Sequence, residues 1–142
     1  MRKMRERGAG AIAPALALAA VVLLFAGCMS AENLDRYLET VSVTDPDFSA
    51  LGDGTYQGEY DIDLPPGAWA VNQYFRVDLE MSGGAAVEIE ILEPETFSDN
   101  EDFAAYIDRI LEAQSLQVDA VSGGTISSKA FVKAVEDAAT PE

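Results

Sequence analysis

Apolar and polar side chains alternate along the chain from residue 69 to residue 81. One face carries Trp69, Val71, Gln73, Phe75, Val77, Leu79 and Met81, and the other carries Ala70, Asn72, Tyr74, Arg76, Asp78 and Glu80. Successive side chains of a β-strand point to opposite faces, so this pattern predicts a long strand with one buried face. Such a strand requires partner strands and a cover for its apolar face.

Two shorter stretches on either side show the same period. The first has Tyr56, Gly58, Tyr60 and Ile62 on one face, and the second has Val87, Ile89 and Ile91 alternating with Glu88 and Glu90. A Ser82-Gly83-Gly84 turn separates the second from the long strand, which is typical of a hairpin. We therefore predict an antiparallel sheet of three strands between Thr55 and Leu92, with one wet and acidic face.

After the predicted sheet, the spacing of apolar residues indicates two helices. Ser98 and Glu101 have the spacing of a capping box, and an apolar stripe follows to about Gln114, formed by Phe103, Tyr106, Ile107, Ile110 and Leu111. This helix is expected to cover the sheet. Residues 116–121 are a candidate fourth strand, and Phe131, Ala134, Val135 and Ala138 predict a short final helix. The predicted fold is α+β: three to four antiparallel strands packed against one helix, with a short C-terminal helix.

The loop before the final helix, Asp119–Ser128, holds two adjacent glycines and several hydroxyl side chains. Gly123 and Gly124 permit a tight turn and a close approach of the backbone to a ligand. The start of a helix offers free N–H groups and the positive end of the helix dipole, which suit a phosphate. A Gly/Ser turn with a serine N-cap explains the same residues without a ligand.

This loop resembles the signature of the FMN-binding domain family, Asp-x-x-Ser/Thr-Gly-Ala-Thr, found in subunits of Rnf and sodium-pumping quinone reductase complexes and in small extracytoplasmic electron carriers. Asp119, Ser122, Gly123 and Thr125 match, and Gly124 stands where alanine is usual. The resemblance covers roughly residues 53–139, including the opening Asp53-Gly54-Thr55-Tyr56-Gln57-Gly58. It implies covalent FMN, attached through its phosphate to Thr125 by a flavin transferase.

Within that resemblance, the neighbouring side chains have expected roles. Ser127 and Ser128 are predicted to cap the final helix, and Asp119 to brace the loop or serve recognition by the transferase. Lys129 is a candidate counter-charge for the phosphate, with a solvated lysine as the alternative.

The N-terminus resembles a lipoprotein signal peptide. Four basic residues within the first seven precede an apolar run, which ends in a lipobox-like Leu24-Phe25-Ala26-Gly27-Cys28. We predict cleavage before Cys28 and a lipid on its sulfur; an uncleaved membrane anchor is the alternative. The expected organisation is a signal peptide over 1–27, a lipidated tether or linker over 28–52 and the FMN-binding domain over 53–142. Within residues 31–43, Leu34, Tyr37, Leu38 and Val41 fall at helical spacing, so this stretch is either a short amphipathic helix near the anchor or part of the tether.

Composition narrows the possible chemistry. The chain has no histidine and one cysteine, which excludes histidine-based catalysis, the usual zinc sites and an intramolecular disulfide. Its net charge is −16, and removal of residues 1–27, which hold four basic residues and one acidic residue, makes it −19. Such a surface repels nucleic acid. Glu93 and Glu95 form a weak candidate acid/base pair, and we predict no catalytic residue.

The function expected from these features is an extracytoplasmic, membrane-anchored electron carrier. Its partners would be a flavin transferase, redox donor and acceptor proteins or a quinone-linked membrane dehydrogenase, and the membrane itself. The alternative is a binding or structural lipoprotein without covalent flavin. Any of six aromatic residues is a candidate for stacking on the flavin, with core packing as the alternative: Tyr56, Tyr60, Trp69, Tyr74, Phe75 and Tyr106.

Overall fold

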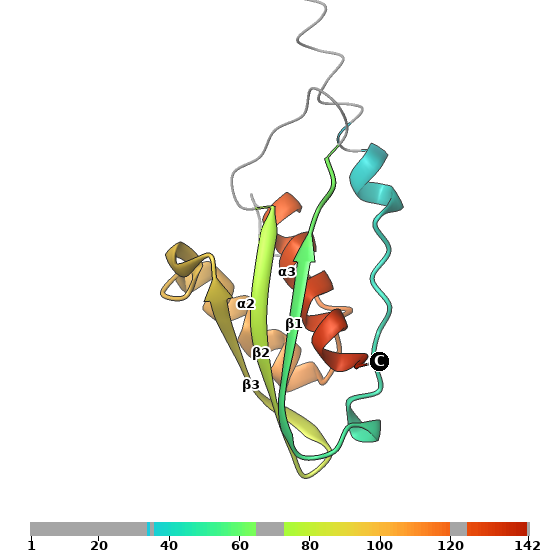
Figure 1. Ribbon diagram of the computed structural model, residues 1–142, viewed down its shortest axis with the longest axis vertical. Helices are drawn as coiled ribbons and strands as arrows, with labels where there is room; N and C mark the ends of the chain where they lie inside the picture. The colour runs from blue at the N-terminus through green and yellow to red at the C-terminus, as the bar shows by residue number, and fades with distance from the viewer. Residues whose placement is uncertain (1–33, 35, 65–72, 120–124, 142) are drawn as a thin grey trace, which may run out of the picture.

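A computed structural model describes residues 34, 36–64, 73–119 and 125–141. Its elements are the strands β1 (Gly54–Asp61), β2 (Tyr74–Ser82) and β3 (Ala85–Glu93), the helices α2 (Glu101–Ala113) and α3 (Thr125–Ala139), and the 3-10 turns η1 (Phe48–Ala50) and η2 (Glu95–Phe97). The strands form one antiparallel sheet in the order β1-β2-β3, with the helices packed on one side (Figure 1). The predicted α+β class is confirmed.

The alternation in β2 produces the expected two faces. Phe75, Val77, Leu79 and Met81 are buried, and the side chains between them are partly or fully exposed. Trp69 and Val71, predicted on the same strand, lie outside the described residues, and β2 begins at Tyr74. Its hairpin with β3 turns through Gly83 and Gly84, whose φ angles of 63° and 78° favour glycine.

One side chain of β3 points the other way from the prediction. Val87 is 48% exposed, whereas Ala86 is buried. The register shifts between Glu80, which faces Glu88, and Met81, which faces Ala86, so Val87 is the extra residue of a β-bulge. The bulge reverses the alternation before Ile89, and the prediction that Val87 shares the dry face with Ile89 and Ile91 is wrong.

Helix α2 occupies the predicted range, but its cap differs. The side chain of Asn100 accepts hydrogen bonds from the N–H groups of Asp102 and Phe103, so Asn100 rather than Ser98 is the N-cap. Ser98 instead ends the 3-10 turn η2. On the apolar stripe Ile110 is fully buried, whereas Ile107 is only partly buried.

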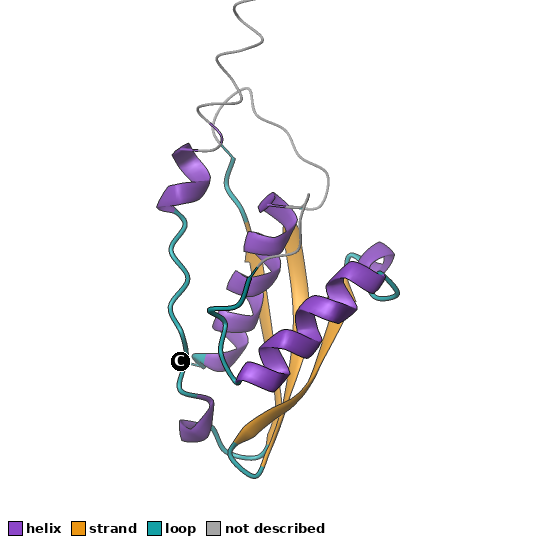
Figure 2. Ribbon diagram, turned by 180° about the vertical axis from the view of Figure 1, so that it is seen from behind, coloured by secondary structure: helices purple, strands orange, loops and turns teal. Residues whose placement is uncertain are grey.

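Helix α3 is longer and more central than predicted. It has 15 residues against 13 in α2, and it packs on both β1 and β2 (Figure 2). Helix α2 contacts β3 and meets α3 through Phe103 and Phe131, whose ring centroids are 5.5 Å apart. The sheet is therefore covered by two helices rather than one. Residues 116–119 form no strand, so the described part of the chain contains no fourth strand.

Residues 36–51, called the upstream arm below, also contribute to the core. Residues 36–40 are helical, and the arm then runs along the molecule in an extended conformation to η1 (Figure 1). Leu38, Val41 and Phe48 are buried. The arm therefore packs on the domain, whereas a flexible linker would leave such side chains in water.

The predicted signal peptide and Cys28 lie outside the described residues. Among the residues that are described, no helix is long and apolar enough to cross a membrane.

Candidate functional site

The predicted attachment residue, Thr125, is the first residue of α3. The N–H groups of the first turn of a helix lack partners within the helix, and the helix dipole is positive there. The predicted final helix is present, but it begins at Thr125, inside the stretch predicted as a loop, rather than after Ser128. Ser122, Gly123 and Gly124 lie outside the described residues.

The predicted capping role of the two serines is wrong. Ser127 and Ser128 are the third and fourth residues of α3, already inside its first turn, whereas an N-cap precedes the first helical residue. Ser127 is partly buried. Ser128 is 3% exposed, and its hydroxyl has no hydrogen-bond partner within the described part of the chain. A buried hydroxyl without a partner is costly, so Ser128 is suited to bond a ligand.

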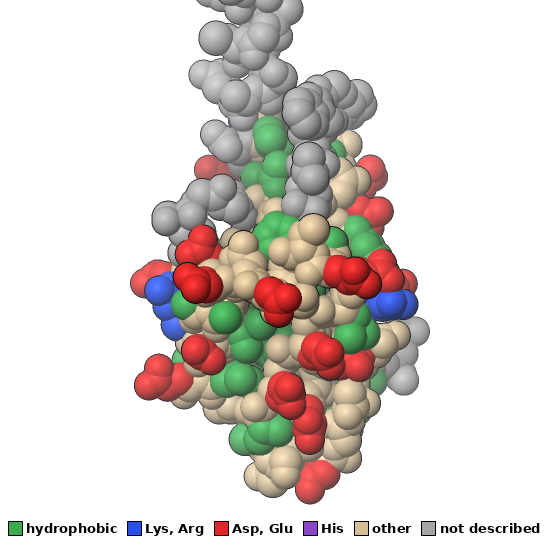
Figure 3. Space-filling view, turned by 90° about the vertical axis from the view of Figure 1, so that its left-hand side faces the viewer, with side chains coloured by type: hydrophobic (Ala, Val, Ile, Leu, Met, Phe, Trp, Pro, Cys, Tyr) green, Lys and Arg blue, Asp and Glu red, His purple; other side chains and the backbone are tan. Residues whose placement is uncertain are grey.

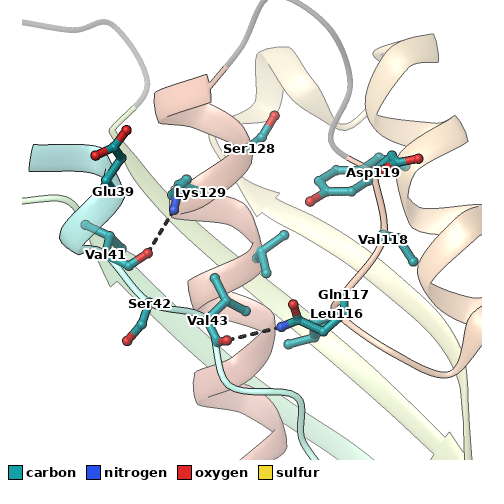
Figure 4. A pocket seen from close by; sticks show the side chains of 12 residues that line it. Glu39, Val41, Ser42, Val43, Leu116, Gln117, Val118, Asp119, Ser128 and Lys129 are labelled. Carbon is teal, nitrogen blue, oxygen red and sulfur yellow. Dashed lines mark hydrogen bonds between the residues drawn. The ribbon is translucent and has the colours of Figure 1, made fainter. Parts of the chain in front are cut away.

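Ser128 lines a cavity of about 580 Å³ between α3, the segment after α2 and the upstream arm (Figure 4). Its walls are formed by Glu39, Val41, Ser42, Val43, Tyr106, Leu116, Gln117, Val118, Asp119, Ser128, Lys129 and Val132. This volume lies in the range of small-molecule sites, roughly 300–1,000 Å³. Six of these twelve residues are polar or charged, and the other six are apolar or aromatic.

Lys129 supplies the positive charge among these lining residues. Its Nζ donates a hydrogen bond to the Val41 carbonyl oxygen at 2.9 Å. The two ion pairs found in the described residues, Arg76–Glu93 and Lys133–Glu136, do not include it. An ammonium group has three donors, so Lys129 retains capacity for an anion. Glu39 and Asp119, which also line the cavity, oppose an anion there.

Among the six candidate aromatic residues, Tyr106 lines this cavity. It is 4% exposed, and burial raises the pKa of its phenol, an effect that the charge of Arg109 partly offsets. Phe75 is buried in the core, and the hydroxyl groups of Tyr56 and Tyr74 bond Gly52 and Glu59. The Tyr60 ring lies beneath Lys133 and outside this cavity. Trp69 lies outside the described residues.

The remaining predicted residues are placed as follows. Asp119 is exposed, and its backbone carbonyl accepts a hydrogen bond from Arg109 at 3.2 Å, which braces the segment leading to the loop. Glu93 pairs with Arg76 at 2.6 Å, and Glu95 is exposed in η2, so the structure gives no support to an acid/base pair.

Four lining residues come from the segment predicted to be a tether or linker: Glu39, Val41, Ser42 and Val43. The helical spacing of Leu34, Tyr37, Leu38 and Val41 signalled an apolar face there. No local pattern indicated that this face packs beside α3.

The described residues form a small α+β domain with a cavity beside the first turns of its last helix. The model of the FMN-binding domain family matches residues 69–140, and the chain belongs to this family. Comparisons with curated proteins and with solved structures gave no match. Family membership makes FMN the cofactor of this domain and favours a flavin-bound electron carrier.

Proposed function

We propose that this protein is an extracytoplasmic electron carrier, anchored to the membrane through Cys28, with FMN bound covalently by a phosphoester to Thr125. The observation that carries the proposal is the position of Thr125. It begins α3 one helical turn before Ser128 and Lys129, which line a cavity large enough for a flavin.

The lining residues fit the two ends of FMN. The backbone at the start of α3 and the Lys129 ammonium suit the phosphate. The Ser128 hydroxyl, which has no hydrogen-bond partner among the described residues, offers a further hydrogen bond. Tyr106, Leu116 and Val132 provide aromatic and aliphatic surface for the ring. When bound, FMN supplies the redox chemistry, and the chain supplies attachment, position and electrostatics.

Thr125 is an acceptor rather than a catalyst. Its hydroxyl oxygen forms the new bond to phosphorus, the pyrophosphate bond of FAD breaks, AMP leaves and the hydroxyl proton is taken up by the transferase. No histidine is present in the chain to activate this hydroxyl, so the external flavin transferase must do so. The protein is thus the substrate of an enzyme and not itself one.

Co-production with a flavin transferase tests the attachment. We expect a fluorescent band that survives denaturing electrophoresis and a mass gain of one FMN minus water. Thr125→Ala should lose both, whereas Ser122→Ala should retain the acceptor and reduce only the yield. Thr55→Ala, which changes an exposed threonine in β1, is the matched control and should be labelled fully.

Absence of covalent flavin from the wild-type protein beside a competent transferase would refute this form of the proposal. Gly124→Ala, which introduces the residue usual in the family, would then be the first variant to test. A binding or structural lipoprotein without covalent flavin would be the remaining function.

A further inference from the structure

One wall of the cavity comes from outside the region that the family model matches. The match begins at residue 69, whereas the upstream arm contributes Glu39, Val41, Ser42 and Val43 to the lining. The opposite wall comes from Gln117, Val118 and Asp119, and α3 lies between the two (Figure 4).

Hydrogen bonds fix the arm on both sides of the cavity. Lys129 Nζ donates to the Val41 carbonyl oxygen at 2.9 Å, which joins the arm to α3. Gln117 Nε2 donates to the Val43 carbonyl oxygen at 3.1 Å, which joins it to the opposite wall (Figure 4). The cavity is therefore bounded on this side by main chain whose Val41 and Val43 carbonyl groups are partnered.

Beyond the cavity, the arm is held through its own carboxylate at Asp45. Asp45 accepts a hydrogen bond from the Leu116 backbone N–H at 2.7 Å and another from the Ser115 hydroxyl at 2.8 Å. Leu38 and Phe48, on either side of this stretch, are buried. The arm is thus anchored by packing at both ends and by polar contacts between them.

We propose that the upstream arm is a built-in wall of the flavin site and that Lys129 is the positioning residue that holds it there. This inference rests on the proposed function. The arm shields the ring from water on the side that α3 and the segment 117–119 leave open. Because Lys129 uses one of its three donors on Val41, it can hold the arm and still bond the cofactor phosphate.

Quenching of flavin fluorescence by acrylamide, which is uncharged, measures this shielding in the flavinylated protein. Lys129→Met removes the bond to Val41 while retaining the length of the side chain, and Asp45→Ala releases the other end of the stretch. We expect each change to raise the quenching constant several-fold. Lys133→Met is the matched control: Lys133 lies one turn further along α3, pairs with Glu136 and does not line the cavity, so quenching should be unchanged.

Hydrogen exchange gives a readout that does not depend on flavin. In the Thr125→Ala background, Lys129→Met should accelerate exchange of the amides of residues 41–45, and Lys133→Met should not. Unchanged quenching in flavinylated Lys129→Met and Asp45→Ala proteins would overturn the wall while leaving the proposed function intact. If the intact mass of the wild-type protein shows no FMN, both the wall and the proposed function are overturned. This mass is therefore measured before any quenching experiment.

Discussion

Gly58 of β1 lies so close to α3 that a Cβ at this position would come within 2.2 Å of the Ala134 carbonyl oxygen. The Ala138 backbone nitrogen would be 2.3 Å away. Both neighbours are main-chain atoms of a helix, which cannot move aside as the end of a flexible side chain can. The absence of a side chain at Gly58 therefore sets the spacing between β1 and the helix that begins at Thr125.

Replacement of Gly58 by alanine should destabilise the domain by about 1–3 kcal/mol, because α3 must shift away from β1. Chemical denaturation of the two proteins measures the difference. Gly52→Ala is the control: its Cβ would meet only the Tyr56 hydroxyl at 3.7 Å, an ordinary contact, so the free energy of unfolding should change by less than about 0.5 kcal/mol. Equal effects of the two substitutions would show that the close approach of β1 and α3 is not as described.

Helix α2 offers a test of the core. Ile110 is fully buried, so Ile110→Ala should cost about 2–5 kcal/mol, and Ile110→Asp should prevent folding because it places an unpaired charge in the core. Ile107 is only partly buried, and a carboxylate there can reach water. Ile107→Asp should therefore yield a folded protein by circular dichroism, and a folded Ile110→Asp variant would contradict the packing.

The cap of α2 can be tested with two single substitutions. Asn100→Ala removes the acceptor for two backbone N–H groups and should reduce the free energy of unfolding by about 1 kcal/mol. Ser98→Ala removes a hydroxyl that donates to the Glu95 carbonyl oxygen on the surface, and should change it by less than about 0.5 kcal/mol. Thermal or urea unfolding measures both changes. A larger loss of stability in Ser98→Ala than in Asn100→Ala would identify Ser98 as the cap.

The acidic surface predicts salt-dependent electron transfer. Acidic side chains are spread over the face shown in Figure 3. Exposed acids occur on β3 and α2 at Glu88, Glu90, Glu101, Asp102, Asp108 and Glu112. If this surface steers a basic redox partner, stopped-flow rates should fall as salt rises, because charges are screened over about 10 Å at 0.1 M. An uncharged electron acceptor is the control. Equal salt dependence of the rates with the partner and with this acceptor would exclude electrostatic steering.

The proposed lipid anchor depends on Cys28. Cys28→Ser removes the sulfur that would carry the lipid, so the precursor should keep its full size and no longer be processed as a lipoprotein. Labelling with a fatty acid analogue and separation of membranes from soluble protein measure the effect. A variant that still matures to the wild-type size and stays equally membrane-bound would exclude lipidation at this residue.

Much of the sheet was determined by the sequence itself. The period of two in β2 is a local property of the backbone, and it correctly placed Phe75, Val77, Leu79 and Met81 on the dry face. The two glycines after Ser82 specify the hairpin, because both adopt positive φ angles. The FMN-binding family was also recognisable from sequence, since its signature is a short contiguous run that ends at Thr125.

The tertiary structure decided what depends on contacts between distant segments. The bulge that exposes Val87 arises from pairing with β2, and the central position of α3 depends on its close approach to Gly58. One wall of the cavity depends on the hydrogen bond between Val41 and Lys129, which lies 88 positions later in the chain. Local periodicity shows that a face is apolar but not which surface covers it, because that choice is made by packing across the whole domain.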